Sequence, residues 1–100
     1  MRTAADFISQ FGRSETLANQ SDQHDAARAL EAIGEIAEPA VIPLLTRADQ
    51  QVRYNACALL GKIGGAKSVA TIKKLLLREQ EHHVKFGAEI AMKALGKKGL

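Results

Sequence analysis

One short helical pattern occurs three times in this chain of 100 residues. Residues 25–34, 55–64 and 87–96 each run through alanine and leucine to a closing glycine. The closing glycines are Gly34, Gly64 and Gly96, so the period is 30 and then 32 residues. A period in this range indicates a solenoid of stacked helical repeats. The repeat therefore predicts an all-α fold, in which each unit buries its apolar face against its neighbours.

Aligning the three stretches on their glycines places apolar residues in shared columns, except that Asp22 replaces the valine of the other two units. The columns are Asp22/Val52/Val84, Ala26/Ala56/Ala88, Leu30/Leu60/Met92 and Ile33/Ile63/Leu95. Within each unit the four column positions have the spacing i, i+4, i+8 and i+11, which places them on one face of the helix, as a buried stripe requires. We expect each closing glycine to cap its helix in the left-handed conformation.

Shorter helices are expected between the repeated ones. Pro43 interrupts the apolar run 40–45, so the first of them is predicted to begin near residue 40 or 41. The second covers 68–76, with Val69, Ile72 and Leu76 on its buried face. The predicted core comprises Ala26, Leu30, Ile33, Val41, Leu44, Leu45, Val52, Ala56, Leu60, Ile63, Val69, Ile72, Leu76, Val84, Ala88, Met92 and Leu95.

The chain length fits one domain over residues 1–100. We divide it into an N-terminal capping helix region, 1–20, with Thr3 at the start of a helix, and the repeats, 22–96. The expected architecture is an α-solenoid of about five or six short helices in a right-handed superhelical stack.

The pattern Val52-Arg53-x-x-Ala56-x-x-Leu59-Leu60-x-x-Ile63-Gly64 resembles the first helix of the HEAT-like repeat named after phycobilisome lyases. Residues 41–45 and 69–72 resemble its second helix, and the resemblance covers about residues 22–96. Members of this family include enzymes, lyases, DNA-repair glycosylases and scaffolds, so the resemblance implies the fold more than the function. It also implies that first helices lie on the convex side and second helices on the concave side.

Composition places the chain among soluble, cytoplasmic proteins. The single cysteine, Cys57, excludes an internal disulfide and fits a reducing compartment. The N-terminus lacks the pattern of a secretory signal peptide. The longest strongly apolar stretch, residues 40–45, is too short to cross a bilayer, so no membrane association is expected.

The net charge of +3 conceals two halves of opposite sign. Residues 1–50 hold four basic and eight acidic residues, a balance of −4, whereas residues 51–100 hold ten basic and three acidic residues, a balance of +7. Sequence order in a solenoid follows spatial order, so this pattern predicts an acidic end and a basic end. Head-to-tail self-association between these ends is one consequence to consider.

A basic stripe is the main candidate binding site. It consists of Lys67, Thr71, Lys74 and Arg78, at the spacing i, i+4, i+7, i+11 on the helix that carries Val69, Ile72 and Leu76. On the concave side it would attract an acidic protein segment or phosphates, although lysines on an exposed helix also serve solubility alone. The predicted function is a non-enzymatic scaffold module that binds an acidic protein partner. The alternatives are a nucleic-acid-binding module using the same stripe and a small enzyme or lyase subunit.

The residues that bear catalytic chemistry do not converge in the sequence. His24-Asp25 lies where HEAT-like deoxyhypusine hydroxylases hold iron, but the same column has Tyr54-Asn55 and Phe86-Gly87 in the other units. His82 and His83 are adjacent and so do not form an i, i+4 zinc pair. Cys57 has no repeated His or Asp partner. We therefore expect no catalytic residue, no metal site and no cofactor.

Overall fold

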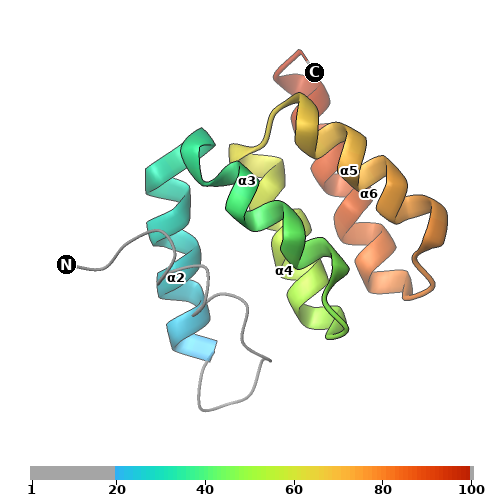
Figure 1. Cartoon of the computed structure of the whole chain (residues 1–100), viewed down its shortest axis with the longest axis horizontal. Helices are drawn as coiled ribbons and strands as arrows, with labels where there is room; N and C mark the ends of the chain where they lie inside the picture. Colours follow the sequence, from blue (N-terminus) through green and yellow to red (C-terminus); the bar gives the residue numbers. More distant parts are fainter. Residues whose placement is uncertain (1–19, 100) are drawn as a thin grey trace.

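The computed structural model describes residues 20–99, with side chains from Ala26 onward, and this part of the chain is helical (Figure 1). The elements are α2 (Gln20–Ile33), the 3-10 helix η1 (Gly34–Ala37), α3 (Glu38–Val41), the 3-10 helix η2 (Ile42–Thr46), α4 (Gln50–Ile63), α5 (Ala66–Arg78) and α6 (His82–Lys97). The all-α prediction is confirmed. The predicted capping region 1–20, including the helix start at Thr3, lies almost wholly outside the described residues.

The helices alternate between two layers, as a stack of helical pairs requires. α2, α4 and α6 are the three repeated helices, and α4 packs along α6. The α3–η2 segment and α5 lie in front of α4 and α6, with α2 at one end of the molecule and α5 and α6 at the other (Figure 1). The arrangement is that of a small α-solenoid.

The predicted core positions are all in the core or packed against it, but four of them are only half-buried. Those four are Ile33, Val69, Leu76 and Met92. Five further apolar side chains are buried that the columns did not predict: Ala37, Cys57, Leu59, Leu75 and Ala91. The difference is largest on α5, whose buried face centres on Ser68, Ile72 and Leu75. The buried face of α5 therefore contains Ser68 and Leu75, whereas the sequence pattern predicted Val69 and Leu76 at its centre.

The second helix of the first unit begins earlier than expected. The prediction of a start near residue 40 or 41 was wrong, because helical turns run continuously from Gly34 to Thr46. Pro39 lies in the first turn of α3, and Pro43 lies in the first turn of η2. Proline cannot donate the backbone hydrogen bond that continues an α-helix, and here the segment changes to 3-10 geometry.

The closing glycines do not share one role. Gly34 adopts φ +79°, as predicted for a left-handed cap. Gly64 is extended, with φ −77° and ψ 165°, and Gly96 lies inside α6, so the prediction was wrong for both. Glycine is needed at position 64 for space, since an added Cβ would lie 2.4 Å from Ser68 Oγ and 2.5 Å from the Leu60 carbonyl oxygen.

Candidate binding surface

Helix α5 presents the basic stripe, and its N-terminus is fixed by a carboxylate from the preceding unit. Gly65, the N-cap residue, has no side chain to satisfy the first amide groups. Glu38 Oε2 instead accepts hydrogen bonds from Gly65 N (2.6 Å), Ser68 N (3.2 Å) and Ser68 Oγ (2.5 Å). A negative charge at a helix N-terminus is favourable, so this contact joins α3 to α5 and sets the orientation of the stripe.

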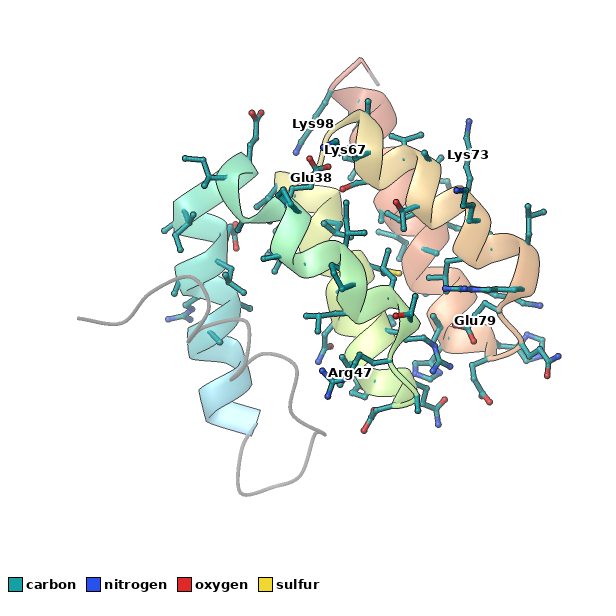
Figure 2. All side chains as sticks on the ribbon, viewed as in Figure 1. Glu38, Arg47, Lys67, Lys73, Glu79 and Lys98 are labelled. Atoms are coloured by element: carbon teal, nitrogen blue, oxygen red, sulfur yellow. The ribbon has the colours of Figure 1, made fainter. Side chains whose placement is uncertain are left out.

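The electrostatics of Glu38 follow from these contacts. Partial burial alone would raise the pKa of its carboxyl. The hydrogen bonds from Ser68 and Gly65 and the nearby charge of Lys67 outweigh burial, and the pKa of Glu38 is held below its ordinary value. Figure 2 shows Glu38 and Lys67 close together near the start of α5.

The four residues of the stripe have the arrangement that their spacing predicts. Lys67, Lys74 and Arg78 are exposed, while Thr71 is half-buried and its hydroxyl donates to the Lys67 carbonyl oxygen at 2.8 Å. Within the described part of the chain, Lys74 and Arg78 form no hydrogen bond and no ion pair. Lys74 and Arg78 therefore offer positive charge that no described contact uses.

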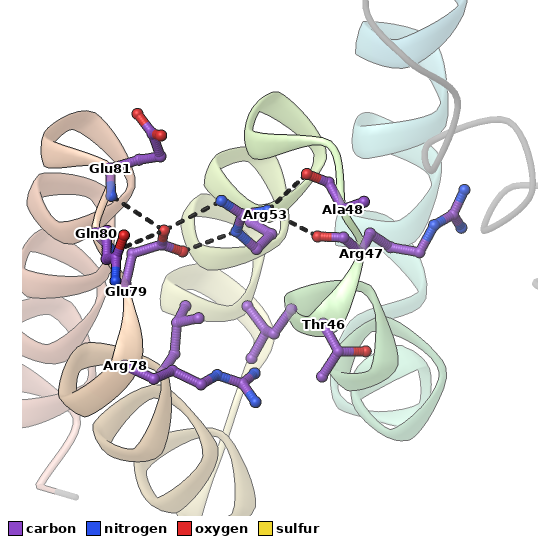
Figure 3. A pocket seen from close by; sticks show the side chains of 10 residues that line it. Thr46, Arg47, Ala48, Arg53, Arg78, Glu79, Gln80 and Glu81 are labelled. Carbon is purple, nitrogen blue, oxygen red and sulfur yellow. Dashed lines mark hydrogen bonds and ion pairs between the residues drawn. The ribbon is translucent and has the colours of Figure 1, made fainter.

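A cleft of about 390 Å³ lies beside the end of the stripe, between two loops (Figure 3). One wall is the turn before α4, with Thr46, Arg47 and Ala48, and the other is the turn before α6, from Arg78 to Glu81. The Arg78 side chain extends over the cleft toward Thr46, whereas the Arg47 side chain points away from it. Arg78 therefore belongs both to the stripe and to the edge of this cleft.

An ion pair forms the back of the cleft and holds its two walls together. Arg53 Nε lies 2.7 Å from Glu79 Oε1, and Arg53 Nη1 donates to the carbonyl oxygens of Arg47 and Ala48 at 2.8 Å each. Glu79 Oε2 accepts from Arg53 Nη2 and from the backbone amides of Gln80 and Glu81. Burial would raise the pKa of Glu79, but these hydrogen bonds and the charge of Arg53 lower it. The same pair raises the pKa of Arg53.

Comparison with known proteins assigns the family. The family model for HEAT repeats matches residues 12–93. This chain belongs to the HEAT-repeat family. No curated protein and no solved structure matches it. The expected resemblance is thus confirmed at the level of the HEAT repeat, and the phycobilisome-lyase subtype stays a prediction.

The HEAT-repeat family typically consists of non-enzymatic scaffolds. HEAT repeats generally mediate protein–protein interaction. Among residues 26–99, no group of three or more His, Cys, Asp or Glu side chains is placed to hold a metal ion. Cys57 is buried, which raises the pKa of its thiol to about 12 and keeps it protonated and unreactive. The side chain of His24 is outside the described set, and His82 and His83 are exposed on α6.

Sequence reasoning found the stripe of this HEAT-repeat chain but missed the contacts that support it. Arg53, Glu79, Glu38 and Ser68 were not predicted as a set. One signal was present: residues 51–100 contain only three acidic residues, and Glu79 is one of them. The few acidic residues of a basic half are candidates for specific pairing with a cation, and Glu79 and Glu81 both lie in the loop before the third repeated helix. None of helices α2 to α6 is both long and apolar enough to pass through a bilayer.

Proposed function

We propose that this chain is a non-enzymatic interaction module that binds an acidic segment of a protein partner along α5. The observation that carries the proposal is that Lys74 and Arg78 are exposed and unpaired among the described residues. Arg53 and Lys62 on the neighbouring helix α4 are instead paired with Glu79 and Glu31. Cations left uncommitted on one helix face steer an acidic partner toward that face.

The dimensions of the stripe define the ligand. From Lys67 to Arg78 the helix rises by about 16 Å, which matches about five residues of an extended peptide. A short segment with several Asp or Glu residues would place its carboxylates near Lys67, Lys74 and Arg78, with Lys73 adding to the field. Arg78 would bind the end of the segment at the cleft, because its guanidinium presents a planar fork that suits a carboxylate. This places the ligand on the layer of second helices, which we take to be the concave side.

Nucleic acid is the second candidate, favoured by the +7 balance of residues 51–100. Phosphates would use the same cations, and their binding would weaken steeply as salt is added. The stripe itself carries no aromatic side chain on which a base would stack. A protein ligand is therefore the better match for this surface, in the cytoplasm, where the free thiol of Cys57 would stay reduced.

A peptide titration tests the proposal. A fluorescent twelve-residue peptide rich in Glu and Asp is titrated with the chain at low salt, and a random DNA duplex is titrated in parallel. We expect the triple variant Lys67→Glu/Lys74→Glu/Arg78→Glu to weaken peptide binding by at least about tenfold, or 1.4 kcal/mol. Circular dichroism verifies that the variant is folded.

The matched control is Lys85→Glu/Lys93→Glu/Lys97→Glu, which makes the same change in net charge on α6. We expect it to bind the peptide within about threefold of the unmodified chain. Equal losses in the two variants would show that binding follows net charge and not the stripe. Tight, salt-sensitive binding of the duplex with weak peptide binding would replace the proposal by the nucleic-acid function.

A further inference from the structure

The cleft at the end of the α5 stripe is lined by Arg53 and Arg78, and the fold uses their guanidinium groups differently. Arg78 forms no hydrogen bond and no ion pair in the described part of the chain, and its side chain extends over the cleft (Figure 3). Arg53 has five N–H groups, and it makes four hydrogen bonds, to Glu79 and to two backbone carbonyl oxygens of the loop before α4. At least one N–H group of Arg53 therefore lacks an acceptor within residues 26–99.

The groups around the cleft suit a carboxylate. A guanidinium group presents its donors as a planar fork that matches the two oxygens of a carboxylate. Gln80, which is exposed on the same wall, adds a side-chain amide that can also donate. The Glu79 carboxylate is engaged by Arg53, and the Glu81 carboxylate points away from Arg78 (Figure 3). The Arg53–Glu79 pair also closes the back of the cleft, so a peptide chain cannot continue through it.

The charge of the surface changes sign where the stripe ends. From Lys67 to Arg78, α5 contains no acidic residue. Glu79 and Glu81 follow directly, and Asp49 lies at the start of α4 beside the opposite wall. An acidic segment on the stripe is therefore attracted as far as Arg78 and repelled beyond it. The last negative group of the ligand belongs at the cleft, and in a chain that ends there this group is the C-terminal carboxylate.

We propose that the acidic ligand of the α5 stripe is the C-terminal segment of its partner, whose terminal carboxylate binds in the cleft between Arg78 and Arg53. The segment runs toward its C-terminus from Lys67 to Arg78. This inference rests on the proposed function, because it names which part of an acidic partner the stripe binds. An internal acidic stretch lacks the terminal carboxylate, and its chain has to continue past the acidic turn after α5.

Three peptides labelled at the N-terminus test the assignment. The first is the acidic peptide with a free C-terminus, and the second is the same peptide with a C-terminal amide. The third is the amide with one extra Glu at its N-terminus, so its net charge equals that of the first. Each is titrated with the full chain at low salt. We expect the free acid to bind at least about tenfold more tightly than either amide, because an amide lacks the charge that pairs with the guanidinium groups.

The ratio of the dissociation constants of the first two peptides, amide to free acid, assigns the carboxylate to the cleft. Arg78→Gln should reduce this ratio to below about threefold, and Arg78→Lys, which keeps the charge without the fork, should give an intermediate value. Lys74→Gln is the matched control, because it removes the same charge from a stripe residue that does not line the cleft. It should weaken both peptides and keep the ratio within about twofold of that of the unmodified chain. Circular dichroism verifies that each variant is folded.

The outcomes separate this inference from the proposed function. A ratio near one in the unmodified chain, with both peptides bound, would overturn the inference and leave the proposed function intact. Equal binding of the first and third peptides would overturn it as well, because net charge would then explain the affinity. A full ratio in Arg78→Gln would show that the terminus binds elsewhere. If the folded chain binds none of the peptides, the proposed function fails and the inference fails with it.

Discussion

The two junctions between the repeated helices use the same columns with different side chains. At the α4–α6 junction the column residues are Gly61 and Gly87, and the backbones come so close that an added Cβ at either position would meet the other helix within 3.1 Å. At the α2–α4 junction the same columns hold Glu31 and Asn55. The cross-helix polar contact there is Lys62 Nζ to Glu31 Oε2, at 3.5 Å between two exposed side chains.

This difference shows how one repeat produces both tight and loose packing. The buried columns keep the units in register, and the two positions that face the neighbouring unit decide how closely the helices approach. Glycine at both positions permits close packing of α4 on α6. A charged side chain at the same position keeps the helices further apart and leaves the contact open to solvent. We therefore expect substitutions to cost more stability at the α4–α6 junction.

The largest effect is expected at Leu60, which is fully buried on α4 between the two junctions. Leu60→Asp places an unpaired charge in the core and should abolish folding, at a cost above about 4 kcal/mol. Ala58→Asp, at an exposed position of the same helix, should stay within about 0.5 kcal/mol. Urea denaturation monitored by circular dichroism measures both variants. A folded and equally stable Leu60→Asp protein would refute the repeat alignment.

Gly87→Val tests the tight junction directly. The new side chain would overlap the Tyr54 ring and push α4 and α6 apart, at a cost of about 2–3 kcal/mol. Gly96→Val is the matched control in the same helix, because a Cβ at position 96 meets no described atom within 4 Å. Thermal unfolding should give a lower Tm for Gly87→Val and an unchanged or slightly higher one for Gly96→Val. Equal Tm values would show that the close approach is not needed.

Glu79→Gln tests the polar contact that accompanies the tight junction. The Arg53 and Glu79 side chains are only 16% and 5% exposed, so loss of the carboxylate leaves a largely buried guanidinium without its charge partner. We expect a loss of about 1–2 kcal/mol in the free energy of unfolding. Glu81→Gln, two residues away and exposed, should change it by less than about 0.5 kcal/mol. If the two variants lose the same amount, the ion pair does not stabilise the junction.

Acid should weaken the contacts made by Glu38 and Glu79. The pKa of each carboxyl is below its ordinary value of 4.5 in the folded chain, so their contribution is complete above pH 4.5. As the pH falls below 4.5 the unfolded chain takes up protons first, and the contribution is lost as the pH passes through the folded values. The double variant Glu38→Gln/Glu79→Gln should lose less stability between pH 5 and pH 3 than the unmodified chain. Urea titrations at each pH measure the free energy of unfolding. If it fell equally with pH in the double variant and in the unmodified chain, Glu38 and Glu79 would not be the source of the acid sensitivity.

The smallest effect is expected at the loose junction. Glu31→Gln removes an ion pair whose two side chains are 48% and 63% exposed, and pairs of this kind contribute little in water. We expect a change of less than about 0.5 kcal/mol in the free energy of unfolding, which added salt would reduce further. A loss as large as that of Glu79→Gln would remove the distinction between the two junctions.

The sequence predicted the repeated helices well because their columns carry a strong period. It predicted the second helices less well. Val69 and Leu76 were placed in the core and are half-buried against it, whereas Ser68 and Leu75 are fully buried. Ser68 lies on the side of α5 that binds Glu38. No period of 3.6 residues reveals a contact between residues 30 positions apart.

The candidate site was likewise predicted only in part. The spacing of Lys67, Thr71, Lys74 and Arg78 placed them correctly on one face of α5. The cleft beside Arg78 was not predicted, because it depends on two loops that the Arg53–Glu79 pair brings together. Single charged residues in loops give no sequence pattern, and their pairing follows from the tertiary fold.

The central claim is that the fold leaves the α5 stripe free for an acidic ligand. Amide chemical shifts of the isotope-labelled chain, recorded while the same acidic peptide is added, test it residue by residue. The account predicts shifts concentrated at residues 67–78 and around the cleft, and their loss in the Lys67→Glu/Lys74→Glu/Arg78→Glu variant. Shifts centred on α6 or α2, or spread evenly over all exposed lysines, would contradict it.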